Sequence, residues 1–127
     1  MIKYFLFLLS FFTIFSQELP PIQSFDIDEY NASGQNWMIT QDDDQNIFVA
    51  NNDGLLRYNG STWELYKTPK NTILRSVKYI NNIIYTGENS DFGYWIKNKN
   101  GFYSYTSLPT KFSFDLLEDE EFWNIVE

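Results

Sequence analysis

Residues 37–58 read W-M-I-T-Q-D-D-D-Q-N-I-F-V-A-N-N-D-G-L-L-R-Y, a series of short apolar runs separated by turn residues. Apolar runs of this length, rich in β-branched and aromatic residues, are typical of strands. Asp and Asn favour the intervening turns because their side chains bond the nearby backbone and tolerate left-handed geometry. The segment therefore predicts three short antiparallel strands, at 36–41, 47–50 and 55–58.

Two dipeptides in this region predict tight hairpin turns. Asp53-Gly54 and Asn59-Gly60 both place a glycine where a two-residue turn needs a positive φ. A fourth, alternating strand follows at 62–66. We therefore predict one four-stranded unit over residues 36–67, with Asp53, Gly54, Asn59 and Gly60 as its structural turn residues.

The same order of elements recurs further along the chain, in residues 73–108. Ile39 matches Val77 after 38 residues, and Gly54 matches Gly93 after 39. The second unit has predicted strands at 74–80, 83–86, 92–96 and 102–106, with a loop at 87–91. A period near 40 residues made of four short strands is the pattern of a propeller blade. The predicted fold is all-β, a partial β-propeller of four-stranded antiparallel blades, and a small β-sandwich is the alternative.

The remaining mature residues flank these two units. Residues 17–35 form an N-terminal lead-in segment, 109–121 an acidic connector, and 122–127 the first strand of a truncated third blade. A closed propeller needs about four to eight blades. The sequence therefore predicts that the chain is part of a longer protein.

The first sixteen residues have the pattern of an export signal. Lys3 precedes an uncharged apolar run, Tyr4 to Phe15, that is shorter than the roughly 20 residues a spanning helix needs. We predict a signal peptide over residues 1–16, with cleavage between Ser16 and Gln17 and export to the periplasm. An uncleaved anchor and a buried helix remain alternatives.

Composition excludes several function classes. Nine Lys and Arg against 17 Asp and Glu give a formal net charge of −8, which disfavours binding to nucleic acid or to an anionic membrane surface. Without Cys or His there is no thiol or imidazole chemistry. We therefore predict no enzyme activity and no cofactor for this segment.

Two acidic clusters are also better explained as turn or loop residues than as a metal site or a catalytic pair. Asp42, Asp44 and Asn46 have the spacing of a calcium loop, but Ile47 and Asp53 stand where such a loop needs Gly and Glu, so no metal is predicted. The carboxylates at 115 and 118–121 could act as a glycosidase pair, yet they lie in the polar connector and are expected to be solvated.

The first unit resembles the repeat of the two-component-regulator propeller family. Gly54-Leu55 and Tyr58-Asn59 match that repeat, whereas Asn46 and Ala50-Asn51 replace its usual Gly and Gly-Thr. The second unit keeps Tyr85-Thr86-Gly87 and Phe92-Gly93-Tyr94. Residues 17–127 as a whole resemble the N-terminus of Bacteroidetes-type sensor regulators. There, a periplasmic propeller precedes a triple-tyrosine domain, a transmembrane helix and a histidine kinase or LuxR-type output.

This resemblance implies a sensor role. The expected partner is a small extracellular ligand, with an oligosaccharide as the favoured class. Membrane attachment would come only from the parent's downstream helix, in the inner membrane, and the parent could be a homodimer. The alternative function is a secreted carbohydrate-binding or carbohydrate-active propeller protein without a signalling role.

The candidate ligand-binding residues are Arg75, Glu88 and Asp91. Arg75 begins an inner strand, and the two acids lie in the 87–91 loop, the kind of position that carries binding on a rigid scaffold. Arg75 could also simply pair with an acid of a neighbouring blade. The four tryptophans, Trp37, Trp63, Trp95 and Trp123, are expected to pack in the core or to stack on sugars.

Overall fold

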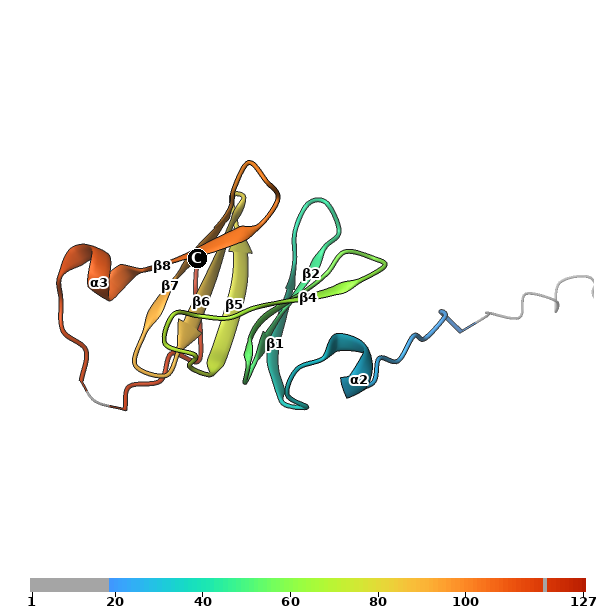
Figure 1. Ribbon diagram of the computed structural model, residues 1–127, viewed down its shortest axis with the longest axis horizontal. Helices are drawn as coiled ribbons and strands as arrows, with labels where there is room; N and C mark the ends of the chain where they lie inside the picture. The colour runs from blue at the N-terminus through green and yellow to red at the C-terminus, as the bar shows by residue number, and fades with distance from the viewer. Residues whose placement is uncertain (1–18, 118) are drawn as a thin grey trace, which may run out of the picture.

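The computed structural model describes residues 19–117 and 119–127, and two four-stranded antiparallel sheets dominate it (Figure 1). In both sheets each strand pairs with the next one in the chain. Sheet 1 contains β1 (Asn36–Gln41), β2 (Ile47–Asn51), β3 (Gly54–Tyr58) and β4 (Trp63–Tyr66). Sheet 2 contains β5 (Leu74–Ile80), β6 (Ile83–Glu88), β7 (Phe92–Lys97) and β8 (Tyr103–Ser107).

The all-β prediction and the two four-stranded antiparallel units are confirmed. Every strand predicted in the two units is present, with ends that differ by at most two residues. The largest difference is in β6, which continues to Glu88, so the predicted 87–91 loop is only Asn89–Asp91. Residues 1–18, which include the predicted cleavage site at Ser16 and Gln17, lie outside the described part.

Two single-turn helices flank the sheets, although the sequence showed no helical periodicity. In α2 (Ile27–Tyr30), the Glu29 carboxylate accepts from the backbone N–H of Asp26 at 2.6 Å. In α3 (Leu108–Phe112), Ser107 caps the first turn by accepting from the Thr110 N–H. Local capping, which periodicity does not detect, therefore forms both helices.

The predicted turns are present but differ in detail. Asn52 and Asp53 are the two residues of the β2–β3 turn, and Gly54 is already the first residue of β3, at φ 139°. The β3–β4 connection has four residues rather than two, because the Asn59 side chain accepts from the N–H groups of Ser61 and Thr62. Asx-type bonding has replaced the tight turn that Asn-Gly predicts.

The two sheets pack face to face on a shared apolar core. Phe48, Ala50 and Leu55 of sheet 1 lie against residues of sheet 2, namely Leu74, Val77, Ile84 and Trp95. β5 lies beside β1, where the Tyr79 N–H donates to the Thr40 hydroxyl at 3.2 Å. A second cluster, on the other face of sheet 1, packs Val49 and Leu56 against Tyr30 of α2.

Strand pairing shows how the two units superimpose. Ile39 and Val77 are equivalent, because each follows a bulge in the first strand of its sheet. The predicted match of Gly54 with Gly93 is wrong. Leu55 lies opposite Ala50 and Phe92 lies opposite Gly87, so Phe92 is the equivalent of Leu55, 37 residues on. The offset falls from 38 to 37 because the β5–β6 turn is one residue shorter than the β1–β2 turn. Ile80 pairs with Ile83 across two residues, whereas Asp42 bonds to Asn46 across three.

The C-terminal residues run along the face of sheet 2 that points away from sheet 1. The Ser76 hydroxyl donates to the Phe122 carbonyl at 2.8 Å, and the Phe122 N–H donates to the Glu88 carbonyl at 3.2 Å. Residues 122–127, predicted as a strand, form none, and the nearest β pairing in the described structure is the isolated Asn89–Glu121 bridge just before them. A strand requires a ladder of such bonds, and no second strand lies beside this segment in the described residues.

Candidate functional site

Arg75 joins three parts of the chain. It is the bulged residue of β5, and its guanidinium lies 4.5 Å from the ring centroid of Trp37 and 4.7 Å from that of Trp123. It also forms an ion pair with Glu121 at 2.8 Å, and its side chain is only 13% exposed. Cation–π stacking on two rings and a short ion pair leave little of the guanidinium for a ligand. The alternative expected for Arg75 is a pairing with an acid of a neighbouring blade; it does pair with an acid, but Glu121 belongs to the predicted connector.

Glu88, the second candidate, is fully buried at the end of β6. The Thr72 hydroxyl donates to its carboxyl, which ties down the segment that enters β5. Burial raises the pKa of Glu88, and the hydrogen bond from Thr72 opposes that rise only in part. Its equivalent in sheet 1, Asn51, likewise binds the Ser33 carbonyl of the segment that enters β1. Both residues therefore fix the segment that enters the first strand of their sheet. Glu88 is fully buried, so a ligand cannot reach it in this arrangement.

Asp91, the third candidate, combines burial with access to a cleft. It accepts from the Phe92 N–H at 2.8 Å and from the Ser107 hydroxyl at 2.7 Å. Its other oxygen pairs with the Lys70 ammonium at 3.1 Å, while the Lys70 side chain stays 56% exposed. The structure thus brings Asp91 and Glu88 together at the two ends of one turn, and it places Arg75 in a separate cluster.

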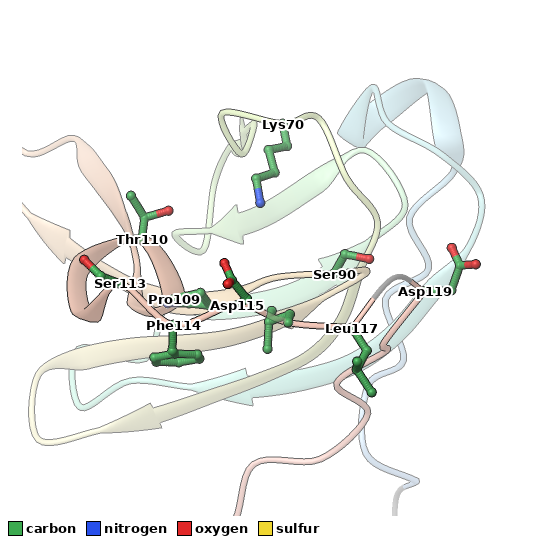
Figure 2. A pocket seen from close by; sticks show the side chains of 10 residues that line it. Lys70, Ser90, Pro109, Thr110, Ser113, Phe114, Asp115, Leu117 and Asp119 are labelled. Atoms are coloured by element: carbon green, nitrogen blue, oxygen red, sulfur yellow. The ribbon is translucent and has the colours of Figure 1, made fainter.

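A hollow on the described surface lies beside this turn, and we call it the connector cleft (Figure 2). Its volume is about 590 Å³. In Figure 2, Lys70 extends from the segment that links the two sheets toward Ser90 and Asp115 on the opposite side. The cleft is lined by Lys70, Ser90, Pro109, Thr110, Ser113, Phe114, Asp115, Leu116, Leu117 and Asp119.

A smaller pocket of about 360 Å³, the Lys70 pocket, adjoins the connector cleft and shares Lys70 and Thr110 with it. Its lining consists of Pro69, Lys70, Asp91, Tyr105, Thr106, Ser107, Thr110 and Lys111. Burial raises the pKa of Tyr105, so its phenol stays neutral. Hydroxyls, ammonium groups and carboxylates around two adjoining hollows are suited to binding a hydroxylated ligand through hydrogen bonds.

Sequence reasoning predicted the loop that borders this site but missed most of its lining. Lys70 lies in the link between the units, and Thr110 and Lys111 belong to a helix that was not predicted. The usable signal was the Thr-Pro-Lys at 68–70 between two four-stranded units, since rigid scaffolds often carry binding groups on the segments that connect their elements.

The tryptophans divide between the two expected roles. Trp95 is buried in the shared core, where its Nε1 donates to the Thr86 hydroxyl at 2.9 Å. Trp63 packs on the outer cluster of sheet 1. Trp37 and Trp123 are 36% and 44% exposed, Arg75 lies over one face of each ring, and the two rings meet edge to face. Arg75 therefore closes one face of each ring to a sugar, while part of both rings stays exposed.

Within residues 19–117 and 119–127, no helix is long and apolar enough to cross a membrane. No three of their acidic side chains are arranged to hold a metal ion. Comparison of the chain with family models, curated proteins and solved structures found no match.

Proposed function

We propose that this chain is the N-terminal part of an exported β-propeller that senses an extracytoplasmic ligand for a transmembrane regulator. Its two sheets would be successive blades. The favoured ligand is a glycan, bound at the connector cleft and the Lys70 pocket. The parent would be periplasmic and anchored in the inner membrane through a downstream helix.

One observation favours blades over a two-layer sandwich. Met38 of β1 accepts through its sulfur from the Val77 N–H of β5, and Ser76, its equivalent 38 residues on, donates to the Phe122 carbonyl. The C-terminal segment thus lies on sheet 2 much as β5 lies on sheet 1. A sandwich has only two packed layers, whereas a propeller repeats the same interface from blade to blade.

The sensing role is supported by the resemblance of residues 17–127 to sensor regulators and by the adjoining hollows. Binding that differs between two conformations is sufficient for a sensor, and no reaction is needed. The alternative is a secreted carbohydrate-binding or carbohydrate-active protein. The acids of the connector cleft, Asp115 and Asp119, are the residues that a hydrolytic alternative would use.

The test uses the complete gene product in a Gram-negative host. We expect it in the membrane fraction, with Gln17 as its first residue, and we expect calorimetry of its periplasmic part to detect at least one oligosaccharide that is recovered uncleaved. A product that stays in the cytosol with Met1 intact contradicts export. Cleavage of the oligosaccharide would favour the enzyme alternative.

A further inference from the structure

Two of the chain's nine cationic side chains line the same small pocket. Lys70 comes from the link between the sheets and Lys111 from α3, and both border the Lys70 pocket. The chain as a whole carries a formal charge of −8. A pair of lysines at one hollow of so acidic a chain is a local reversal of charge, and local charge decides which ligands a pocket attracts.

The negative charge of Asp91, the acid in this pocket, is already balanced by protein groups. Asp91 is almost fully buried, and it takes one ion pair from Lys70 and two hydrogen bonds from Phe92 and Ser107. An ammonium group has three donors, and Lys70 uses one of them on Asp91. Lys111 likewise donates to the Tyr94 hydroxyl at 2.9 Å, a bond that lowers the pKa of Tyr94, and its ammonium lies 5.2 Å from the ring centroid of Tyr94 and 5.6 Å from that of Phe112. Unlike the Arg75 side chain, which is 13% exposed, both lysine side chains are exposed, so both ammonium groups keep donors for a ligand. Two ammonium groups against one carboxylate leave the pocket with one positive charge in excess.

The adjoining connector cleft has the opposite character. Asp115 and Asp119 line it, together with Phe114, whose ring is partly exposed. Carboxylates repel a second acidic group, whereas a ring face and the hydroxyls of Ser90 and Thr110 suit a neutral sugar. The polarity changes at Lys70, one of the two residues that the hollows share.

We propose that the Lys70 pocket binds the acidic group of an anionic glycan, such as a uronate, whose neutral neighbouring sugar lies in the connector cleft. This inference deepens the proposed function, on which it rests, by naming the ligand class and the residues. Lys70 and Lys111 provide the charge-assisted hydrogen bonds, in place of Arg75, which Glu121 and two tryptophans already occupy.

The test compares two disaccharides that differ only in charge. Cellobiouronate carries a carboxylate where cellobiose has a neutral hydroxymethyl group. Calorimetry with the full chain should show that cellobiouronate binds about tenfold more tightly, because a charge-assisted bond is about twice as strong as a neutral one. Inorganic sulfate serves as the anion without a sugar.

Three variants locate the site. Lys111→Gln should weaken cellobiouronate binding about fivefold and leave cellobiose binding unchanged, because only a charge-assisted bond is lost. Lys111→Arg should retain most of the affinity. Lys99→Gln, an exposed lysine in the β7–β8 connection, is the matched control and should have no effect. Lys111 is exposed, so these changes do not disturb the core.

Several results would overturn the inference. Equal affinity for the two disaccharides would exclude an acidic ligand and leave a neutral glycan sensor possible. Binding of sulfate as tight as that of cellobiouronate, lost at physiological salt, would indicate an adventitious ion only. Cellobiouronate binding that Lys111→Gln does not change would place the ligand elsewhere. If the complete periplasmic part bound neither disaccharide, that result would instead count against the proposed function.

Discussion

Glu88 shows how one ionisable residue can make a fold sensitive to pH. It occupies the position that Asn51 has in sheet 1, and both are buried and hold the segment that enters their sheet. Asn51 cannot ionise. Because burial raises the pKa of Glu88 above its value of 4.5 in an unfolded chain, the folded protein binds this proton more tightly than the unfolded chain does.

The first prediction follows from that linkage. The stability that Glu88 contributes is fully present below its unfolded pKa and is lost as the pH rises through the raised folded pKa. Glu88→Gln keeps an oxygen that accepts from Thr72 but carries no charge. Urea midpoints should show the variant gaining on the wild type as the pH rises above 4.5, the unfolded pKa, toward the raised pKa of folded Glu88. A difference between the two proteins that does not change with pH would contradict this expectation.

Gly54 and Gly60 both have positive φ, at 139° and 91°, but they differ in the space around them. A Cβ at Gly60 would meet nothing within 4 Å, so Gly60→Ala should cost only the backbone strain, about 1–2 kcal/mol. A Cβ at Gly54 would lie 2.3 Å from the Tyr66 carbonyl oxygen. Gly54→Ala must therefore also separate β3 from β4 and should cost at least about 1 kcal/mol more. Chemical denaturation of both variants measures the difference, and equal losses would show that the β3–β4 register is different.

At this scale the sequence predicted residue types better than residue roles. Asp-Gly and Asn-Gly located both turns, because their propensities are local. Arg75 could not be assigned, since its partners Trp37 and Glu121 are 38 and 46 residues away in the chain. Asp91, a candidate from its loop position, lines the Lys70 pocket, but Lys70 and Lys111 were missed because only tertiary packing brings them together.

The strands were predictable because each alternates or forms a short apolar run between turn residues. β1 and β5 match their predicted limits. The β6–β7 connection was harder, because Glu88 is a charged residue that the structure uses inside a strand. The segment 122–127 has the composition of a strand, yet pairing depends on a neighbouring strand as well as on composition.

Docking of the C-terminal segment on sheet 2 depends on Gly87. A Cβ at this residue would lie 2.3 Å from the Phe122 carbonyl oxygen and 2.5 Å from the Ser76 hydroxyl oxygen. Gly87→Ala should therefore release residues 120–127 while the β6 pairing persists, because the clash is with that segment. Chymotrypsin should then cleave after Phe122 and Trp123 several times faster than in the wild type, as expected when local opening exposes a site.

The control for this experiment is Gly34→Ala. A Cβ there would approach only the flexible end of the Ile27 side chain, at 2.9 Å. Its cleavage near Phe122 should match that of the wild type. Unchanged cleavage in Gly87→Ala would mean that Phe122 does not lie on Gly87.

For the whole molecule, the two sheets share one core but have separate outer coverings. Residues from both sheets bury each other in the shared core, whereas α2 and the lead-in cover the far face of sheet 1. Repetition of the units could be predicted from the sequence because turn residues recur at similar spacing. Which sheet packs on which could not be predicted. The repeat length defines the four-stranded unit but does not say which other unit lies against it. The two cores should therefore respond differently to a change in either one.

The last prediction compares two tryptophans. Trp95→Ala removes a fully buried side chain from the shared core and its bond to Thr86, which should cost about 3–5 kcal/mol. Since Phe48 and Leu55 of sheet 1 rest on the same core, amide exchange should accelerate in β2 and β3 as well as in β6 and β7. Trp63→Ala instead removes a ring that contacts Phe25 and Tyr30. It should speed exchange in α2 and sheet 1 and leave sheet 2 protected. Exchange in sheet 1 that is insensitive to Trp95→Ala would mean that the sheets fold independently, as separate units rather than as blades stacked on a common interface.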